Sequence, residues 1–229
     1  MIRLENLYKT FVLRGQHKVI ADNINVTFPT GVSVGLMGRN GAGKSSLLSM
    51  IAGTLDPDAG VIISTGTISW PVGFAGSFHK DLTGAQNVRF IARVYGVDTG
   101  SLVEFVKDFA ELGKHFHLPF GTYSSGMRSR LAFGLSMGIR FDTYLVDEVT
   151  SVGDSDFKTK ARRVFQQRMA ESGAIVVTHS IRMVRRLCQA GAVLENGQLS
   201  YYDDVEAAIA HHKRNMGDDD VDDDDDEGF

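Results

Sequence analysis

Residues Gly38-Arg39-Asn40-Gly41-Ala42-Gly43-Lys44-Ser45 decide the fold of this 229-residue chain. The run fits the pattern G-x-x-x-x-G-K-[ST], whose glycines let the backbone close around phosphate oxygens and point successive N–H groups at them. Residues 32–37, just before it, are apolar and predict a strand buried on both faces. Leu47, Leu48 and Ile51, just after it, fall at helical spacing. A strand, a glycine loop and a helix in this order predict an α/β fold with an anion site at the helix start.

Apolar periodicity extends this organisation along the chain. It predicts further strands at residues 19–20, 24–28, 61–63, 68–72, 144–146 and 174–178. From about residue 83 to residue 140 the spacing becomes helical, which predicts an inserted helical subdomain at about residues 76–142. Asn196-Gly197 predicts a two-residue turn between strands at 192–195 and 198–202, and a last helix is expected at about 205–213.

Composition narrows the class of protein. Hydrophobic residues make up 43% and charged residues 23% of the chain, as in globular proteins, which excludes collagen-like, wholly disordered and integral membrane classes. No apolar run approaches the ~18 residues that a spanning helix needs. Cys188 is the single cysteine, so an internal disulfide is excluded. We therefore expect a soluble protein of a reducing compartment, with at most peripheral contact to a membrane.

The charge is unevenly distributed. Nine of the 28 acidic residues lie within 218–229, which leaves 19 acidic against 24 basic groups, a balance of +5, in residues 1–217. That balance is compatible with an anionic ligand or a membrane surface, and it is too weak to indicate nucleic acid. The acidic tail is of low complexity and repels itself, so we expect disorder there. A solvated tail is its simpler interpretation, and a regulatory or partner-docking role is the alternative.

Two short motifs carry the chemistry. Lys44 is placed to neutralise the β- and γ-phosphates of a nucleotide, and the Ser45 hydroxyl to ligate Mg²⁺. About 100 residues later, a predicted buried strand ends in Asp147 and Glu148. In a P-loop ATPase the first such carboxylate helps to hold Mg²⁺ and the second polarises the attacking water. Alternation along a strand aims the two side chains in different directions, so two distinct roles are expected.

A third motif is ambiguous when taken alone. The small residues Ser124, Ser125 and Gly126, followed by Met127, come just before a predicted helix. The exposed N–H groups of a helix start can build an anion site. The same residues also fit a simple serine N-cap, and the residues by themselves do not separate the two interpretations.

In order and spacing, these motifs resemble those of an ATP-binding cassette (ABC) ATPase, with His179 after an apolar run as a further match. The resemblance covers residues 1 to about 213. The sequence YSSGM in place of the common LSGGQ, together with ISWPVG at 68–73 and TGAQNV at 83–88, resembles the ATP-binding subunits of Gram-negative capsular polysaccharide exporters. It implies a nucleotide-binding domain at residues 1–217 that has a P-loop NTPase core, an antiparallel β subdomain and the inserted helical subdomain.

The resemblance also implies roles for individual residues. Phe11 would stack on adenine, with Tyr8 as the second candidate, while Glu148 would be the catalytic carboxylate and His179 would contact the γ-phosphate. Asp154 would lie in a loop that crosses a dimer interface. The ATP-binding loop would comprise Gly38, Arg39, Asn40, Gly41, Ala42, Gly43, Lys44, Ser45 and Ser46, with Mg²⁺ on Ser45 and Asp147; Ser124, Ser125, Gly126 and Met127 would meet the partner's ATP. Relatives carry a glutamine after the strand near residue 74, and residues 74–78 hold none.

What the resemblance implies about function is an ATPase, a capsular-polysaccharide-transporting translocase of the ABC type. Two copies would form a homodimer on an integral membrane permease subunit, at the cytoplasmic face of the bacterial inner membrane. Together they would export capsular polysaccharide at the expense of ATP. Another surface glycan, O-antigen or teichoic acid, is the alternative cargo. A soluble ABC ATPase acting on nucleic acid is a more remote alternative, and no nucleic-acid partner is expected. A nucleotide switch without hydrolysis is disfavoured because the hydrolytic motifs are complete.

Overall fold

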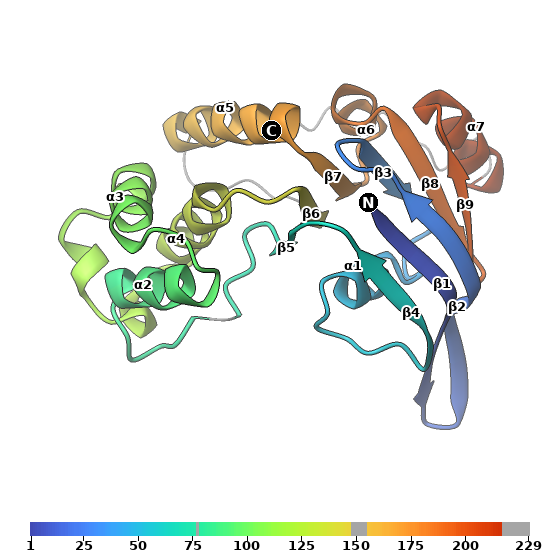
Figure 1. The fold of residues 1–229 in the computed structure, drawn as a ribbon, viewed down its shortest axis with the longest axis horizontal. Coiled ribbons are helices and arrows are strands. Elements are labelled where there is room, and N and C mark those ends of the chain that lie inside the picture. The colour runs from blue at the N-terminus through green and yellow to red at the C-terminus, as the bar shows by residue number, and fades with distance from the viewer. Residues whose placement is uncertain (77, 148–154, 217–229) are drawn as a thin grey trace. The chain divides into compact units, whose positions relative to one another are not determined.

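The computed structural model describes residues 1–76, 78–147 and 155–216, and these form two compact units (Figure 1). The described part of the first unit comprises residues 1–71, 141–147 and 169–216. That of the second comprises residues 72–76, 78–140 and 155–168, of which the last segment lies outside the helical insert expected at about 76–142.

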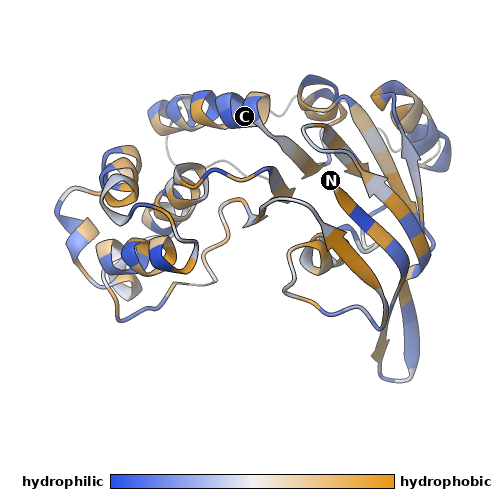
Figure 2. Ribbon diagram, viewed as in Figure 1, coloured by the Kyte–Doolittle hydropathy of each residue, from blue (hydrophilic) through white to orange (hydrophobic). Residues whose placement is uncertain are grey.

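A six-stranded sheet forms the centre of the first unit. Its strand order is β5-β6-β7-β3-β8-β9, and every pairing is parallel except that of β9 with β8. Every residue of β3 and β7 is buried, which explains the continuous apolar runs that predicted them. Figure 2 shows these central strands as mostly hydrophobic. The strands are β3 (Ser33–Met37), β5 (Ile68–Pro71), β6 (Thr143–Asp147), β7 (Gly173–Val177), β8 (Ala190–Glu195) and β9 (Gln198–Tyr202).

An antiparallel sheet of order β2-β1-β4 completes the β structure of this unit. It is built from β1 (Ile2–Leu13), β2 (Gln16–Phe28) and β4 (Ala59–Ser64). The helix α1 (Lys44–Ile51) contacts β2 in this sheet and β6 and β7 in the other. Leu47, Leu48 and Ile51 are at most 4% exposed. The apolar residues whose spacing predicted the helix therefore form the face that the helix buries in the hydrophobic core. The predicted P-loop order of strand, loop and helix is confirmed.

Two further helices contact the six-stranded sheet. They are α6 (Ile181–Leu187) and α7 (Val205–Met216), and the sequence analysis predicted the second of them at 205–213. Both contact β3 (Figure 1). Gly35 permits the approach of α6, because a Cβ there would lie 2.7 Å from Val184 Cγ1. The predicted hairpin is also confirmed: Asn196 and Gly197, at φ of 48° and 79°, make the turn between β8 and β9.

The second unit is helical, as the apolar spacing of residues 83–140 predicted. It contains α2 (Gly84–Val94), α3 (Thr99–Ala110), η1 (Gly113–His117), η2 (Phe120–Thr122), α4 (Ser125–Gly138) and most of α5 (Ser155–Glu171). Its core is aromatic: the Phe109 ring lies 5.8 Å from Phe105, 5.9 Å from Phe133 and 5.2 Å from Phe157. Helices α2, α3 and α4 start with side-chain caps, such as Asp98, which accepts a 2.7 Å hydrogen bond from Ser101 N. Among the described residues, no helix is both long and apolar enough to cross a membrane.

Candidate functional site

Parallel pairing brings the carboxyl ends of three strands to one edge of the sheet. β3 runs beside β7, and β7 runs beside β6, with Asp147 opposite Val177. The glycine loop follows β3, Asp147 ends β6, and His179 lies two residues beyond β7. Ligands of open α/β sheets bind at this edge. Topology therefore collects residues that are up to about 140 positions apart in the chain.

The glycine loop depends on two close backbone approaches. A Cβ on Gly38, where φ is 150°, would overlap the carbonyl oxygen of Leu194. A Cβ on Gly43, where φ is 106°, would lie 2.6 Å from Cγ2 of the buried residue Ile20. Both positions therefore require glycine, for space and for backbone conformation. Gly43 is also the N-cap residue of α1, so the loop leads into the free N–H groups of a helix start.

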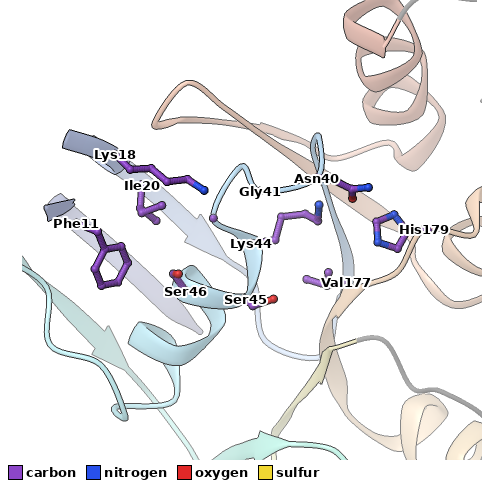
Figure 3. A pocket seen from close by; sticks show the side chains of 11 residues that line it. Phe11, Lys18, Ile20, Asn40, Gly41, Lys44, Ser45, Ser46, Val177 and His179 are labelled. Carbon is purple, nitrogen blue, oxygen red and sulfur yellow. The ribbon is translucent and has the colours of Figure 1, made fainter. Parts of the chain in front are cut away.

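Around this loop lies an open pocket of about 280 Å³ (Figure 3). Eight of the residues predicted to bind nucleotide line it, and they come from β1, the loop, α1 and the segment after β7: Phe11, Asn40, Gly41, Gly43, Lys44, Ser45, Ser46 and His179. The predicted loop residues Gly38, Arg39 and Ala42 lie outside this lining. The sequence analysis missed Lys18, Ile20 and Val177, which complete the lining.

Lys44 is held inside the loop by backbone carbonyls. Its Nζ donates hydrogen bonds to Gly38 O at 2.7 Å and to Arg39 O at 3.1 Å, and the residue is only 8% exposed. The ammonium therefore stands at the helix start, where the dipole of α1 also favours an anion. Such an arrangement can neutralise the phosphates of a nucleotide.

Of the two aromatic candidates for the base, Phe11 lines the pocket and Tyr8 does not. Phe11 is 39% exposed, and Lys9 Nζ lies 5.5 Å from its ring centroid. Lys9 in turn donates to Asp58 Oδ1 at 2.8 Å. This hydrogen bond, followed by that from Thr10 N, holds the pKa of Asp58 below its usual range. The contacts fix the part of β1 that carries Phe11.

The oxygen ligands near the loop fit Mg²⁺. The Ser45 side chain lines the pocket, and Asp147 ends β6, which β7 separates from β3 in the sheet. Hydroxyl and carboxylate oxygens are hard ligands, and protein-bound Mg²⁺ usually keeps several waters and binds substrate phosphates as well. No cluster of three or more His, Cys, Asp or Glu in the described ranges could hold a metal ion. Ser45 and Asp147 together leave coordination positions for waters and for phosphate oxygens.

The electrostatics around the loop favour an anion. Burial lowers the pKa of His212, on α7, below its usual range. Electrostatic interactions with Lys44, then with His211 and His179, lower it further, and Glu195 opposes them. The sequence analysis did not connect this helix with the loop, because only the tertiary structure brings them together.

Comparison with known proteins shows to which family this chain belongs. The family model described as "ABC transporter" matches residues 21–151. The chain belongs to the ABC transporter family.

Two curated relatives of this ABC protein are similar over nearly their full length. The "Polysialic acid transport ATP-binding protein KpsT" of Escherichia coli is 49% identical over 93% of this chain and 96% of its own. The "Capsule polysaccharide export ATP-binding protein CtrD" of Neisseria meningitidis serogroup B is 39% identical over 93% and 98%. Family membership indicates a nucleotide-binding subunit that hydrolyses ATP.

A solved structure has the same fold. The ATP-binding cassette MJ0796, in a dimeric post-hydrolysis state bound to ADP and Pi, matches with a TM-score of 0.70 at 22% identity. The match covers 87% of this chain and 97% of that one. It confirms the predicted α/β fold of the ABC ATPase type.

The signature residues of this ABC chain lie in the second unit, at the start of α4. Ser124 is the N-cap, and its Oγ accepts a hydrogen bond from Met127 N at 3.3 Å. The N-cap interpretation is therefore confirmed, while contact of the signature with a partner's ATP stays a prediction. Ser125 is the first residue of α4, and a Cβ on Gly126 would meet no atom within 4 Å.

Residues 74–78, where the family resemblance led us to expect a glutamine, hold none. Phe74 is 51% exposed. Gln86, the nearest glutamine along the chain, forms a capping box at α2: its Oε1 accepts from Thr83 N at 2.8 Å, and Thr83 Oγ1 accepts from Gln86 N at 3.1 Å. Gln86 thus has a structural role at the helix start.

Three predictions lie outside the residues that the structure describes. They are the catalytic carboxylate Glu148, the interface residue Asp154 and the acidic tail at 218–229.

Proposed function

We propose that this chain hydrolyses ATP to power export of capsular polysaccharide across the bacterial inner membrane. The observation that carries the proposal is its near-full-length likeness to ATP-binding proteins named for polysialic acid transport and capsule polysaccharide export. The pocket around the glycine loop supports the nucleotide part of it, because its lining combines an exposed aromatic ring, a helix start and a buried lysine.

In this proposal the described residues bind and orient ATP. Phe11 stacks on the adenine, and the loop from Gly38 to Ser46 wraps the phosphates. Lys44 neutralises the β- and γ-phosphates, and Ser45 and Asp147 hold Mg²⁺, which supplies charge neutralisation at the transferring phosphoryl group.

Hydrolysis then needs a base beside the γ-phosphate. Glu148 directly follows Asp147, the last residue of β6. We assign to Glu148 the role of the base that polarises the attacking water. His179, which lines the pocket after β7, contacts the γ-phosphate and steadies that water. In the sequence Glu148 follows β6 and His179 follows β7, and these two strands pair in the sheet.

The working unit is a homodimer bound to a permease. The signature residues Ser124 to Met127 of one copy complete the ATP site of the other, and Asp154 lies in the loop that crosses between them. The dimer docks on an integral membrane permease at the cytoplasmic face of the inner membrane. Closure on ATP and opening after hydrolysis move the polysaccharide cargo through that subunit.

The Glu148→Gln variant tests the enzyme. We expect it to bind MgATP, to lose turnover by about 100-fold or more, and to accumulate as an ATP-bound dimer in light scattering. Wild-type protein with MgADP is the control and should stay monomeric. Normal hydrolysis by the variant, with no dimer in either protein, would contradict both the catalytic assignment and the composite site.

A deletion strain tests the cargo. Removing the gene should abolish surface capsule while leaving O-antigen or teichoic acid unchanged, and the wild-type chain should restore the capsule where Lys44→Ala does not. Loss of another glycan with intact capsule would assign the alternative cargo.

A further inference from the structure

Lys18 is a cation of the pocket that none of the recognised motifs contains. It lies on β2, 20 residues before the glycine loop, and it is one of the lining residues that the sequence analysis missed. Figure 3 shows its side chain extending from the strand toward the loop.

The register of the first hairpin fixes this placement. Lys18 pairs with Phe11 across β1 and β2, and directly paired residues project from the same face of a sheet. The side chains of Phe11 and Lys18 therefore project side by side from the same face of the hairpin. At its far end, Lys18 Nζ lies 3.4 Å from the position that a Cβ of Gly41 would take. The side chain thus reaches from the aromatic end of the pocket to the loop.

The charge of the lining is one-sided. Lys18, Lys44 and His179 can carry positive charge, and no carboxylate occurs among the described residues that line the pocket. Lys44 is held by loop carbonyls, whereas the structure shows no hydrogen bond or ion pair from Lys18 to the described residues. Lys18 is exposed, so its ammonium is available to a ligand without first breaking a contact.

We propose that Lys18 is a further nucleotide-binding residue, whose ammonium contacts phosphate oxygens of ATP and ADP beside the glycine loop. The inference rests on the proposed function and deepens it, because it assigns a phosphate contact to the strand opposite Phe11. An ammonium is a flexible point charge with three donors, suited to a polyphosphate that is reached from the solvent side.

The expected effect is moderate because the site is open to water. An exposed pair at close range is stabilised by about 1 kcal/mol, which corresponds to a loss of about 3- to 10-fold in affinity when the lysine is removed. Salt screens exposed charges, so the loss should shrink as ionic strength rises. AMP has one phosphate fewer than ADP and should be affected less.

The test is titration calorimetry of the full chain with MgATP, MgADP and AMP, at low and at high ionic strength. Lys18→Ala should weaken the binding of MgATP and MgADP by about 3- to 10-fold. Lys18→Arg should bind both nucleotides with an affinity close to that of wild type. Lys114→Ala is the matched control: it removes an exposed lysine of η1, in the other unit, and should bind nucleotide normally. Thermal unfolding without ligand should be the same for all variants.

The outcomes separate the inference from the proposed function. Wild-type protein that binds no MgATP would overturn the proposed function itself. Normal binding by wild type together with unchanged binding by Lys18→Ala would overturn only the role of Lys18. Equal losses in Lys18→Ala and Lys114→Ala, or in Lys18→Ala and Lys18→Arg, would also overturn it, since they would indicate overall charge or local structure as the cause.

Discussion

The glycine loop can take its conformation because the side chain of Gly43 is a single hydrogen rather than a methyl group. The residue takes a φ of 106°, and Ile20, which is 2% exposed, occupies the space where its Cβ would be. Ile20 is fixed in turn by its strand and by the core beneath it. Neither the loop nor the strand can move aside without loss of packing.

We therefore expect Gly43→Ala to weaken MgATP binding by about 100-fold or more, since both the positive φ and the overlap with Ile20 oppose the loop conformation. Equilibrium binding of a fluorescent ATP analogue measures this. Gly100→Ala is the control, because that Cβ would lie 3.5 Å from Asp98 Oδ1, an ordinary contact. Tight nucleotide binding by Gly43→Ala would show that the loop can form around a side chain.

At the scale of elements, one carboxylate ties the starts of β5 and β6. Asp142 Oδ2 accepts from Thr67 N at 2.7 Å and from Thr67 Oγ1 at 2.8 Å. These hydrogen bonds, the backbone one first, hold the pKa of Asp142 below its ordinary value of 3.8. A carboxyl group with a lowered folded-state pKa stabilises the fold above its unfolded-state pKa, and that contribution is lost as the pH falls through the folded-state value.

Asp142→Asn should accordingly lower the free energy of unfolding at neutral pH by about 1 kcal/mol or less, since the group is exposed to water. The difference from wild type should stay constant above about pH 5 and shrink as the pH falls below about 4. Urea unfolding at a series of pH values measures both. Asp108→Asn, at an exposed position of α3, is the control for the loss of one surface carboxylate. A difference that persists unchanged at the lowest pH would rule out the carboxylate as its cause.

At the scale of the whole molecule, the proposed composite site divides its residues between two subunits. The glycine loop lies in the first unit, and the signature lies in the second. A symmetric dimer builds such a site twice. Lys44→Ala disables the loop, and Gly126→Asp places a negative charge at the signature where a Cβ meets no neighbour, so both variants should fold.

Each variant alone should lack ATPase activity, and an equal mixture should recover up to about one quarter of wild-type activity, because half of the dimers are mixed and each has one intact site. A phosphate-release assay on the separate and mixed proteins measures this. The double variant Lys44→Ala/Gly126→Asp mixed with wild type separates subunit exchange from complementation. No recovery despite mixed dimers in light scattering would argue against shared sites.

The features that could be predicted from the sequence are those that depend on residues close together in the chain. Residues adjacent in the chain specify the glycine loop, the buried strand before it and the apolar face of α1. The structures of these three segments could therefore be predicted. The Asn196-Gly197 hairpin is likewise a local turn rule. Helix α5 was not predicted, because its 17 residues are mostly polar and show little apolar periodicity.

The sequence by itself determined the family, the phosphate loop and the order of strand, loop and helix around it, because each depends on residue types at fixed spacing. The tertiary structure alone decided that Phe11 rather than Tyr8 faces the pocket. It alone brought Lys18, Ile20 and Val177 to the loop and placed His212 in its field. For Phe11, Lys18 and Ile20 the physical reason is strand pairing: which side chains share a face depends on the register between β1 and β2, and a shift of one residue would turn these side chains to the other side.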